Sequence, residues 1–243
     1  MTLTLSTDEL RVAATLEGGR LPVALGREWS EEDIPVADLV ALRGLLARGL
    51  AIARPGTLEV SLTDEATTIS TLLDPSTLVE VHRDSVERAG RWLIAERDGT
   101  VVSCAESRPD LWSFGTVDVD LLMADLVAAL PDDAVDQRSM RVRTDLLVEA
   151  DRNVETGEGE LAALLANVRS TTTVRRVQRV RGTSSAVAIT WLETAGAGAW
   201  LVSPVDDHRD GNMPVPHTEL SPIGREDLLA LVADVLDLSG AER

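Results

Sequence analysis

The sequence contains no lysine and no tyrosine, and it has a single cysteine, a single phenylalanine and three histidines. Without lysine, a nucleotide-binding P-loop of the usual kind cannot form. The lone Cys104 excludes an internal disulfide framework and a multi-thiolate metal site. The apolar runs fall short of the ~20 residues that span a bilayer. The first residues also lack the basic segment of a signal peptide. We therefore expect a cytoplasmic protein.

Positively charged residues are also scarce relative to acidic ones. The chain has 41 acidic residues against 23 cations, all of them arginine, which gives a net charge of −18. Such a charge repels nucleic acid and anionic membrane surfaces, so neither is an expected partner. An arginine-only chain rich in alanine, valine and aspartate is typical of a GC-rich bacterial genome. The hydrophobic fraction of 44% is nevertheless that of a folded globular protein.

The patterns along the 243 residues alternate between helix and strand. Ser6 and Glu9 have the spacing of a capping box, which predicts a helix to about Leu16. A second helix is predicted by apolar residues that recur at intervals of three and four, namely Val36, Leu39, Leu42, Leu46 and Leu50. A strand at 58–62 and a helix at 64–73 follow. We therefore expect an α+β protein.

Two hairpin-like segments share a pattern. They read GRWLIAERDGTVVSC at 90–104 and AITWLETAGAGAWLVS at 188–203, and each contains Trp-Leu and Val-Ser. A strand is expected before each hairpin, at 77–83 and 172–181, and a helix with Asp-Leu-Leu after each. We interpret this as a degenerate internal duplication whose units could pair edge to edge in one sheet. The expected halves are 1–136 and 137–243 of one continuous domain. A chance match of common β patterns is the alternative.

No catalytic, cofactor-binding or metal-binding signature is found. Gly157 and Gly159 form a lone G-x-G without a third glycine. His82 lies on the polar side of a predicted strand, and His217 has no nearby partner in the sequence. His208 lies in an Asp-Asp-His-Arg-Asp run that could bind a cation but is more typical of a solvated loop. We expect no enzyme activity, no metal and no cofactor, and we expect Cys104 to be inert packing.

Two groups of residues could instead contact a protein partner. Trp112 and Phe114 lie in a polar segment at 106–119 that we expect to be a loop, where aromatic side chains either pack over the core or anchor a partner. Arg175 and Arg179 belong to the densest basic cluster and share one side of a predicted strand. They either protect an edge strand from aggregation or align an acidic partner.

Four features in order together resemble a known family. They are Leu5-x-x-x-Glu9-Leu10, then Leu21-Pro22, a helix that ends Arg48-Gly49-Leu50, and a closing Ser-Pro…Asp-Leu-Leu helix at 221–229. With the duplicated units, this pattern resembles EspG, the cytosolic chaperones of actinobacterial type VII secretion. The resemblance implies a quasi-twofold central antiparallel sheet flanked by two helical groups.

The resemblance also implies a function and a partner. A chaperone of this kind binds the tip of a helical PE–PPE-type or WxG-like substrate and keeps it soluble before export. In the family, the connection between the strands expected at 77–83 and 91–97 can be a long loop, whereas here it is only about seven residues. Two other functions stay open. The chain could be a winged-helix-like transcriptional regulator, since Arg-Gly-Leu before a strand also resembles that fold, or an enzyme with an unrecognised site. The oligomeric state is left open.

Overall fold

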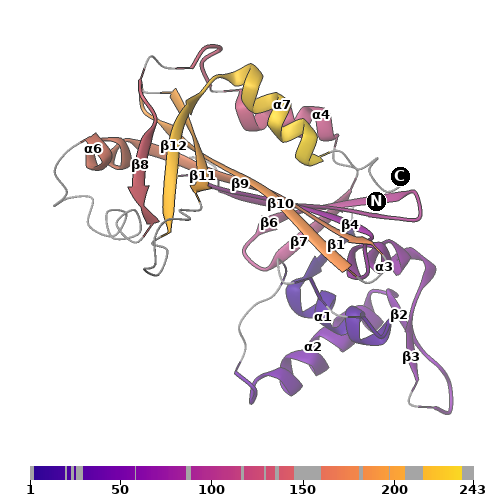
Figure 1. Ribbon diagram of the computed structural model, residues 1–243. Helices are drawn as coiled ribbons and strands as arrows, with labels where there is room; N and C mark the ends of the chain where they lie inside the picture. Colours follow the sequence, from indigo (N-terminus) through magenta and orange to yellow (C-terminus); the bar gives the residue numbers. More distant parts are fainter. Residues whose placement is uncertain are drawn as a thin grey trace.

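The computed structural model describes residues 3–236, except for 20, 23–24, 26–29, 58, 86–88, 116–117, 129, 135–136, 145–159, 181–182, 197 and 206–215. The described chain forms one large antiparallel sheet with helices on both faces (Figure 1). Among the residues that the structure describes, no helix is long and apolar enough to cross a membrane.

The large sheet has ten strands in the order β1-β7-β6-β5-β4-β9-β10-β11-β12-β8. Every neighbouring pair is antiparallel. The strands are β1 (Leu3–Ser6), β4 (Thr77–Ser85), β5 (Gly90–Arg97), β6 (Thr100–Arg108), β7 (Leu111–Gly115), β8 (Met140–Arg143), β9 (Val168–Val180), β10 (Thr183–Thr194), β11 (Gly198–Val205) and β12 (His217–Ile223). A separate two-stranded sheet joins β2 (Ala51–Ala53) to β3 (Val60–Leu62).

This strand order is symmetric about the central pair β4 and β9. Moving outward, β5, β6, β7 and β1 lie on one side, and β10, β11, β12 and β8 lie on the other. The helices are α1 (Thr7–Leu16), α2 (Ile34–Ala47), α3 (Thr67–Leu73), α4 (Val119–Val127), α6 (Glu160–Ala166) and α7 (Arg225–Leu236). Each half therefore places a helix before its four central strands and another after them. The α+β fold with a quasi-twofold antiparallel sheet is confirmed.

Local sequence signals explain several of these elements. Ser6 caps α1 as predicted, because its hydroxyl accepts from the Glu9 amide at 3.1 Å and the Glu9 carboxylate accepts from the Ser6 amide at 2.9 Å. Asp98 and Gly99 have φ of 52° and 75°, the left-handed values that a two-residue hairpin turn requires. The predicted hairpin of β5 and β6 is thereby confirmed.

The helices divide the core into three clusters. On one face of the sheet, α4 and α7 cover the central strands around Trp191 and Val174, and both halves contribute to this cluster. On the opposite face, α1, α2 and α3 cover β1 and β5–β7 around Trp112. On that same face, α6 covers β10–β12 around Trp200. Figure 1 shows α4 and α7 together, with α1–α3 across the sheet from them and α6 at the far end.

The prediction of a loop at 106–119 is wrong. Trp112 and Phe114 lie on β7, and their side chains are 1% and 6% exposed. The Trp112 indole donates to the Thr7 hydroxyl at 3.2 Å, and β1 pairs along β7. In the sequence, the charged neighbours of these residues hide the strand. β7 is fixed by its pairing with β1, which lies near the start of the chain. Of the two alternatives for Trp112 and Phe114, packing against the core is the one that their burial supports.

Other predictions also need correction. The Trp-Leu repeat predicts that Trp92 and Trp191 are equivalent buried residues, but Trp191 is fully buried whereas Trp92 is only partly buried against the same cluster. In α2 the buried residues are Ala41 and Leu45, and the expected core residue Val36 is 66% exposed. Ser221 and Pro222 were expected to begin the last helix, but they lie in β12, and α7 begins at Arg225. Finally, β9 is a central strand, so its arginines do not protect an edge.

Candidate partner-binding surface

Among the described residues, no helix covers one part of the central sheet on the side that carries α1–α3. We call it the open sheet face and define it by Glu80, His82 and Asp84 of β4, Thr171, Thr173 and Arg175 of β9, and Ala188 and Thr190 of β10. The strand register places these residues together, since directly opposed residues in antiparallel strands share a face. His82 lies opposite Thr173, which lies opposite Thr190. In the next row, Arg175 lies between Glu80 and Ala188.

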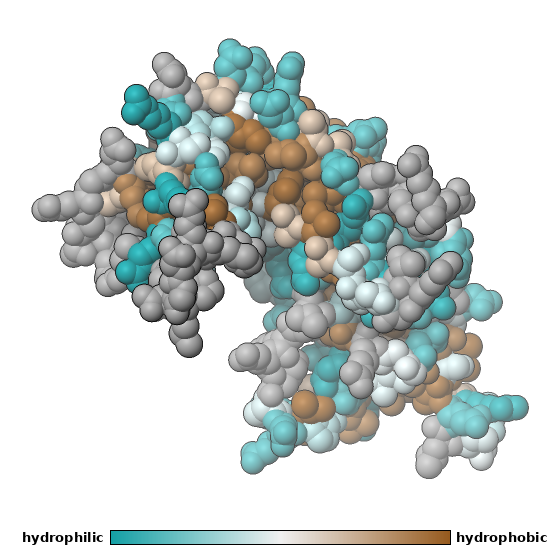
Figure 2. Space-filling view, in the orientation of Figure 1, coloured by the Kyte–Doolittle hydropathy of each residue, from teal (hydrophilic) through white to brown (hydrophobic). Residues whose placement is uncertain are grey.

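Covered regions border this surface at both ends. Leu78, two residues before Glu80, belongs to the α1–α3 cluster, and Leu192, two residues after Thr190, belongs to the α6 cluster. Between them His82 and Arg175 are exposed, and none of the residues that define the open sheet face is buried. Figure 2 shows the molecule hollowed between the part that carries α6 and β8 and the part that carries α1 and α2. The open sheet face therefore lies in a recess.

The surface carries paired charges. Arg175 Nη1 lies 3.3 Å from Glu80 Oε2, across the β4–β9 boundary between the two halves. Arg179 Nη1 lies 3.0 Å from Asp74 Oδ1 at the end of α3, and Arg97 Nη1 lies 3.3 Å from the other oxygen of the same carboxylate. The prediction that Arg175 and Arg179 share one side of their strand is confirmed. Both guanidinium groups stay partly exposed and can reach a partner.

Neutral polar groups fill the middle of the surface. The hydroxyls of Thr173 and Thr190 lie 3.0 Å apart, and His82 stands exposed on the neighbouring strand. Donors and acceptors therefore alternate over the open sheet face. An arrangement of this kind can hydrogen-bond polar groups that a partner presents, whereas it offers little apolar area.

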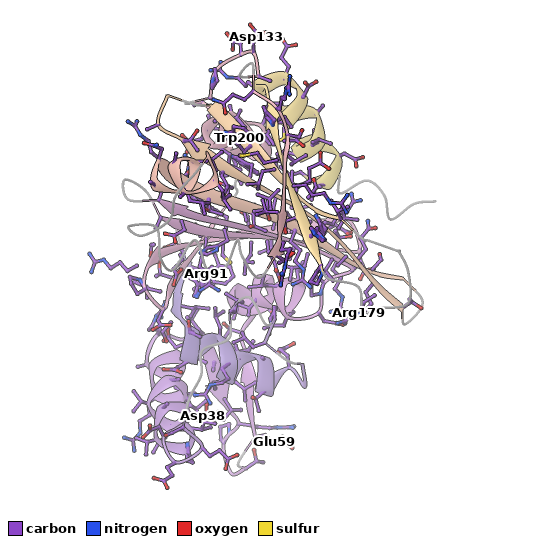
Figure 3. The ribbon with its side chains drawn as sticks, turned by 60° about the vertical axis from the view of Figure 1, so that its left-hand side comes forward. Asp38, Glu59, Arg91, Asp133, Arg179 and Trp200 are labelled. Atoms are coloured by element: carbon purple, nitrogen blue, oxygen red, sulfur yellow. The ribbon has the colours of Figure 1, made fainter. Side chains whose placement is uncertain are left out.

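The four predicted contact residues do not come together. Trp112 and Phe114 lie on β7, four strands from Arg175 and Arg179 on β9, which is about 19 Å at the usual strand spacing. Trp112 meets the surface indirectly, because the Arg91 guanidinium stacks 5.3 Å from its ring centre. Arg91 lies opposite His82 in the strand register. Figure 3 shows Arg91 between the helices and the sheet and Arg179 near the projecting β9–β10 hairpin.

Sequence reasoning missed most of this surface. It placed His82 on the polar side of a strand, which its exposure confirms. It did not identify Glu80, Thr173 or Ala188, although the alternation of β4 and β9 contains the signal. Alternation assigns residues to a side of one strand, but only the pairing of β4 with β9 brings the two polar sides together.

The described residues offer little chemistry for catalysis. Burial raises the pKa of the Cys104 thiol from 9.0 to about 12, so it is not a nucleophile at neutral pH. Among the described residues there is no group of three or more histidine, cysteine, aspartate or glutamate side chains that could hold a metal ion. His208 and the glycines at 157 and 159 lie outside the described residues.

The fold is similar to that of a solved type VII secretion chaperone. A matching solved structure is that of the Mycobacterium tuberculosis type VII secretion system chaperone EspG5 in complex with a PE25-PPE41 dimer. The match has a TM-score of 0.58 and 14% sequence identity, and it covers 98% of this chain and 96% of the other. No family model and no curated protein match the sequence. The predicted resemblance to EspG is thus confirmed at the level of the fold.

Proposed function

We propose that this protein is a cytoplasmic chaperone that binds the end of a helical type VII secretion substrate and catalyses no reaction. The open sheet face supports the proposal most directly. It is a recessed stretch of central sheet, polar and exposed, between two regions that helices cover. A fold shared with a chaperone that binds a PE25-PPE41 dimer supports a PE–PPE-like partner.

The chemistry of the open sheet face suits the end of a helix. The first four N–H groups and the last four C=O groups of a helix lack partners within that helix. Glu80 and Asp84 can accept from such N–H groups, and Arg175 can donate to such C=O groups or to acidic side chains near them. We propose that Arg175 and Arg179 contact the partner directly. Trp112 and Phe114 are buried, so they would support the surface from the core, and Trp112 would do so through its contact with Arg91.

Net charge fits the same role. A charge of −18 keeps the free protein and its complex dispersed, because copies repel one another. It also argues against the regulator alternative. The exposed face of α2 carries Val36, Leu39 and Val40, and the preceding residues Glu31, Glu32 and Asp33 are acidic and exposed. A recognition helix instead needs basic residues to approach phosphate.

The test is direct binding. We would co-express the full chain with helical PE–PPE-type pairs encoded near its gene, with PE25-PPE41 as a reference pair and an unrelated helical dimer as the control. The proposal predicts that at least one of these pairs co-purifies with the chain and gives a calorimetric binding isotherm. Retention of no secretion pair, or equal retention of the unrelated dimer, would contradict it.

A further inference from the structure

Helix α2 presents apolar side chains to solvent. Its inner side contributes Ala41 and Leu45 to the α1–α3 cluster. Figure 1 shows α2 on the outside of this helical group, with α1 between it and the large sheet. We call the outer side the α2 stripe, which consists of the exposed residues Val36, Leu39, Val40, Arg43 and Ala47. The side chains of its three bulky apolar members are between 50% and 66% exposed.

The composition of α2 is unusual for a helix at the surface. Such a helix normally carries polar residues on its outer side, because only its inner side is removed from water. In α2, Asp38 and Arg43 are the two charged residues among 14, and Asp38 pairs with Arg11 of α1 at 3.0 Å. The core therefore does not account for the apolar residues of the α2 stripe. Exposed apolar residues that gather in one place mark sites of protein interaction.

The spacing of the α2 stripe suits a helix as its partner. Its members follow one another at intervals of three and four residues, which form a ridge along one side of a helix. A second helix packs on such a ridge through its own rows of side chains at the same intervals. An extended peptide instead adds a strand to the edge of a sheet, and the backbone groups of a helix are already paired.

The charges at the two ends of the α2 stripe define the charges of that partner. Glu31, Glu32 and Asp33 are exposed just before α2, and Arg43 is exposed toward its other end. Helices usually carry acidic residues in the first turn and basic residues in the last turn. An antiparallel partner would therefore place its basic last turn beside residues 31–33 and its acidic first turn beside Arg43. The same acidic residues, together with the net charge of −18, disfavour an anionic membrane surface.

We propose that the α2 stripe binds an amphipathic helix of another protein, antiparallel to α2, with an acidic first turn and a last turn rich in lysine or arginine. This surface is separate from the open sheet face, which lies on β4, β9 and β10, so the proposal does not rest on the secretion substrate. A single helix on one stripe buries less than the ~1,200 Å² of a stable standard interface. The complex is therefore weak and transient.

The test measures the binding of two synthetic peptides to the full chain by fluorescence anisotropy. The first is a labelled helix with leucines at intervals of three and four, glutamates in the first turn and lysines in the last turn. The second has the same composition, with the charges exchanged between its ends. A hydrocarbon staple holds both peptides helical, and circular dichroism checks that their helix content is equal. The first peptide should bind at least about tenfold more tightly than the second, because only its charges complement those of α2.

Variants of the chain locate the contact. Val40→Asp should weaken binding of the first peptide at least about tenfold, because a carboxylate would have to leave water without a partner. Glu32→Arg should weaken the first peptide and strengthen the second. Leu121→Asp is the matched control, an exposed apolar residue of α4 replaced by the same acid, and it should change nothing. His82→Glu on the open sheet face should also leave the peptide bound, so failure of the proposed function would be seen separately.

Three results would overturn the proposal. The first is that neither peptide binds, and the second is that both bind equally. The third is an equal loss of affinity in Val40→Asp and Leu121→Asp. Sedimentation equilibrium separates another occupant, a second copy of the chain. A mass that rises with concentration in the wild type but not in Val40→Asp would assign the α2 stripe to that copy and would also overturn the proposal.

Discussion

Single residues show where sequence patterns mislead. Trp112 and Phe114 stand among Arg108, Pro109 and Asp110, so their surroundings in the sequence indicate a solvated loop. In the structure they form one buried side of β7. A five-residue strand has only two or three inward positions, and polar neighbours on the outward side hide so short an alternation. Exposure of an aromatic residue therefore could not be inferred from neighbours in sequence alone.

Cys104 gives a prediction at the residue scale. Its burial was predicted and is confirmed, and it raises the thiol pKa from 9.0 to about 12. Between these values the unfolded chain loses the proton and the folded chain keeps it, so the folded state becomes less stable as pH rises. The stabilisation is complete below pH 9 and falls by at most ~1.4 kcal/mol per pH unit above it.

The measurement is urea unfolding of wild type and Cys104→Ala between pH 8 and 11. The alanine variant should be less stable at pH 8 because a buried side chain is truncated, but its stability should fall less steeply above pH 9. Parallel pH profiles would show that the thiol does not titrate as its burial implies.

At the scale of elements, patterns within one segment predicted its structure, whereas strands that depend on pairing with a distant segment were not predicted. The capping box of α1 and the Asp98-Gly99 turn depend on adjacent residues, and both were predicted. The strands β1, β8 and β12 were missed. β1 and β8 are four residues long, and β12 contains Pro222, which resembles a helix start. Such strands are defined by the strand beside them, which the local pattern does not contain.

A buried ion pair between elements gives the second prediction. Arg83 of β4 reaches across β9 to Glu193 of β10 at 2.9 Å, and it also donates to the Leu126 carbonyl at the end of α4. Glu193 accepts from the Trp191 indole at 3.2 Å. The two side chains are 15% and 10% exposed. Removing one partner leaves the other charge buried, which costs about 3–5 kcal/mol in comparable pairs.

We therefore expect Arg83→Met or Glu193→Gln to lower the free energy of unfolding by about that amount. The double variant should lose less than the sum of the two. Arg175→Met is the matched control, because the Arg175–Glu80 pair is partly exposed and should be worth only about 0–1 kcal/mol. Urea unfolding monitored by circular dichroism gives all four values. Equal, small losses in every variant would show that the pair is not desolvated.

At the scale of the whole molecule, the repeat was visible in the sequence but its assembly was not. The Trp-Leu and Val-Ser pattern indicated two similar units, and the symmetric strand order bears out the duplicated fold. What joins the units is the pairing of β4 with β9, between segments about ninety residues apart in the sequence. Because several strand edges could satisfy the same pattern, periodicity alone does not select this pair. The open sheet face exists only because of that pairing.

We propose that the halves 1–136 and 137–243 form one continuous domain, because the α4 and α7 cluster contains residues of both. Each of the three core clusters holds one buried tryptophan, namely Trp112, Trp191 and Trp200. Tryptophan fluorescence therefore reports on all three clusters, and circular dichroism reports on the backbone. The two signals should show one coincident urea transition. Two separated transitions would mean that the halves fold independently.

We propose that the open sheet face binds a helical secretion substrate. The decisive measurement is the calorimetric affinity for a co-purifying PE–PPE-type pair, with glutamate placed on either side of the sheet. His82→Glu and Arg175→Glu change the open sheet face, whereas Leu121→Glu adds an acidic side chain at an exposed position of α4 on the opposite face. We expect the first two variants to weaken binding at least about tenfold, or 1.4 kcal/mol, and Leu121→Glu to leave it unchanged. Unchanged affinity in His82→Glu and Arg175→Glu, or an equal loss in Leu121→Glu, would contradict it.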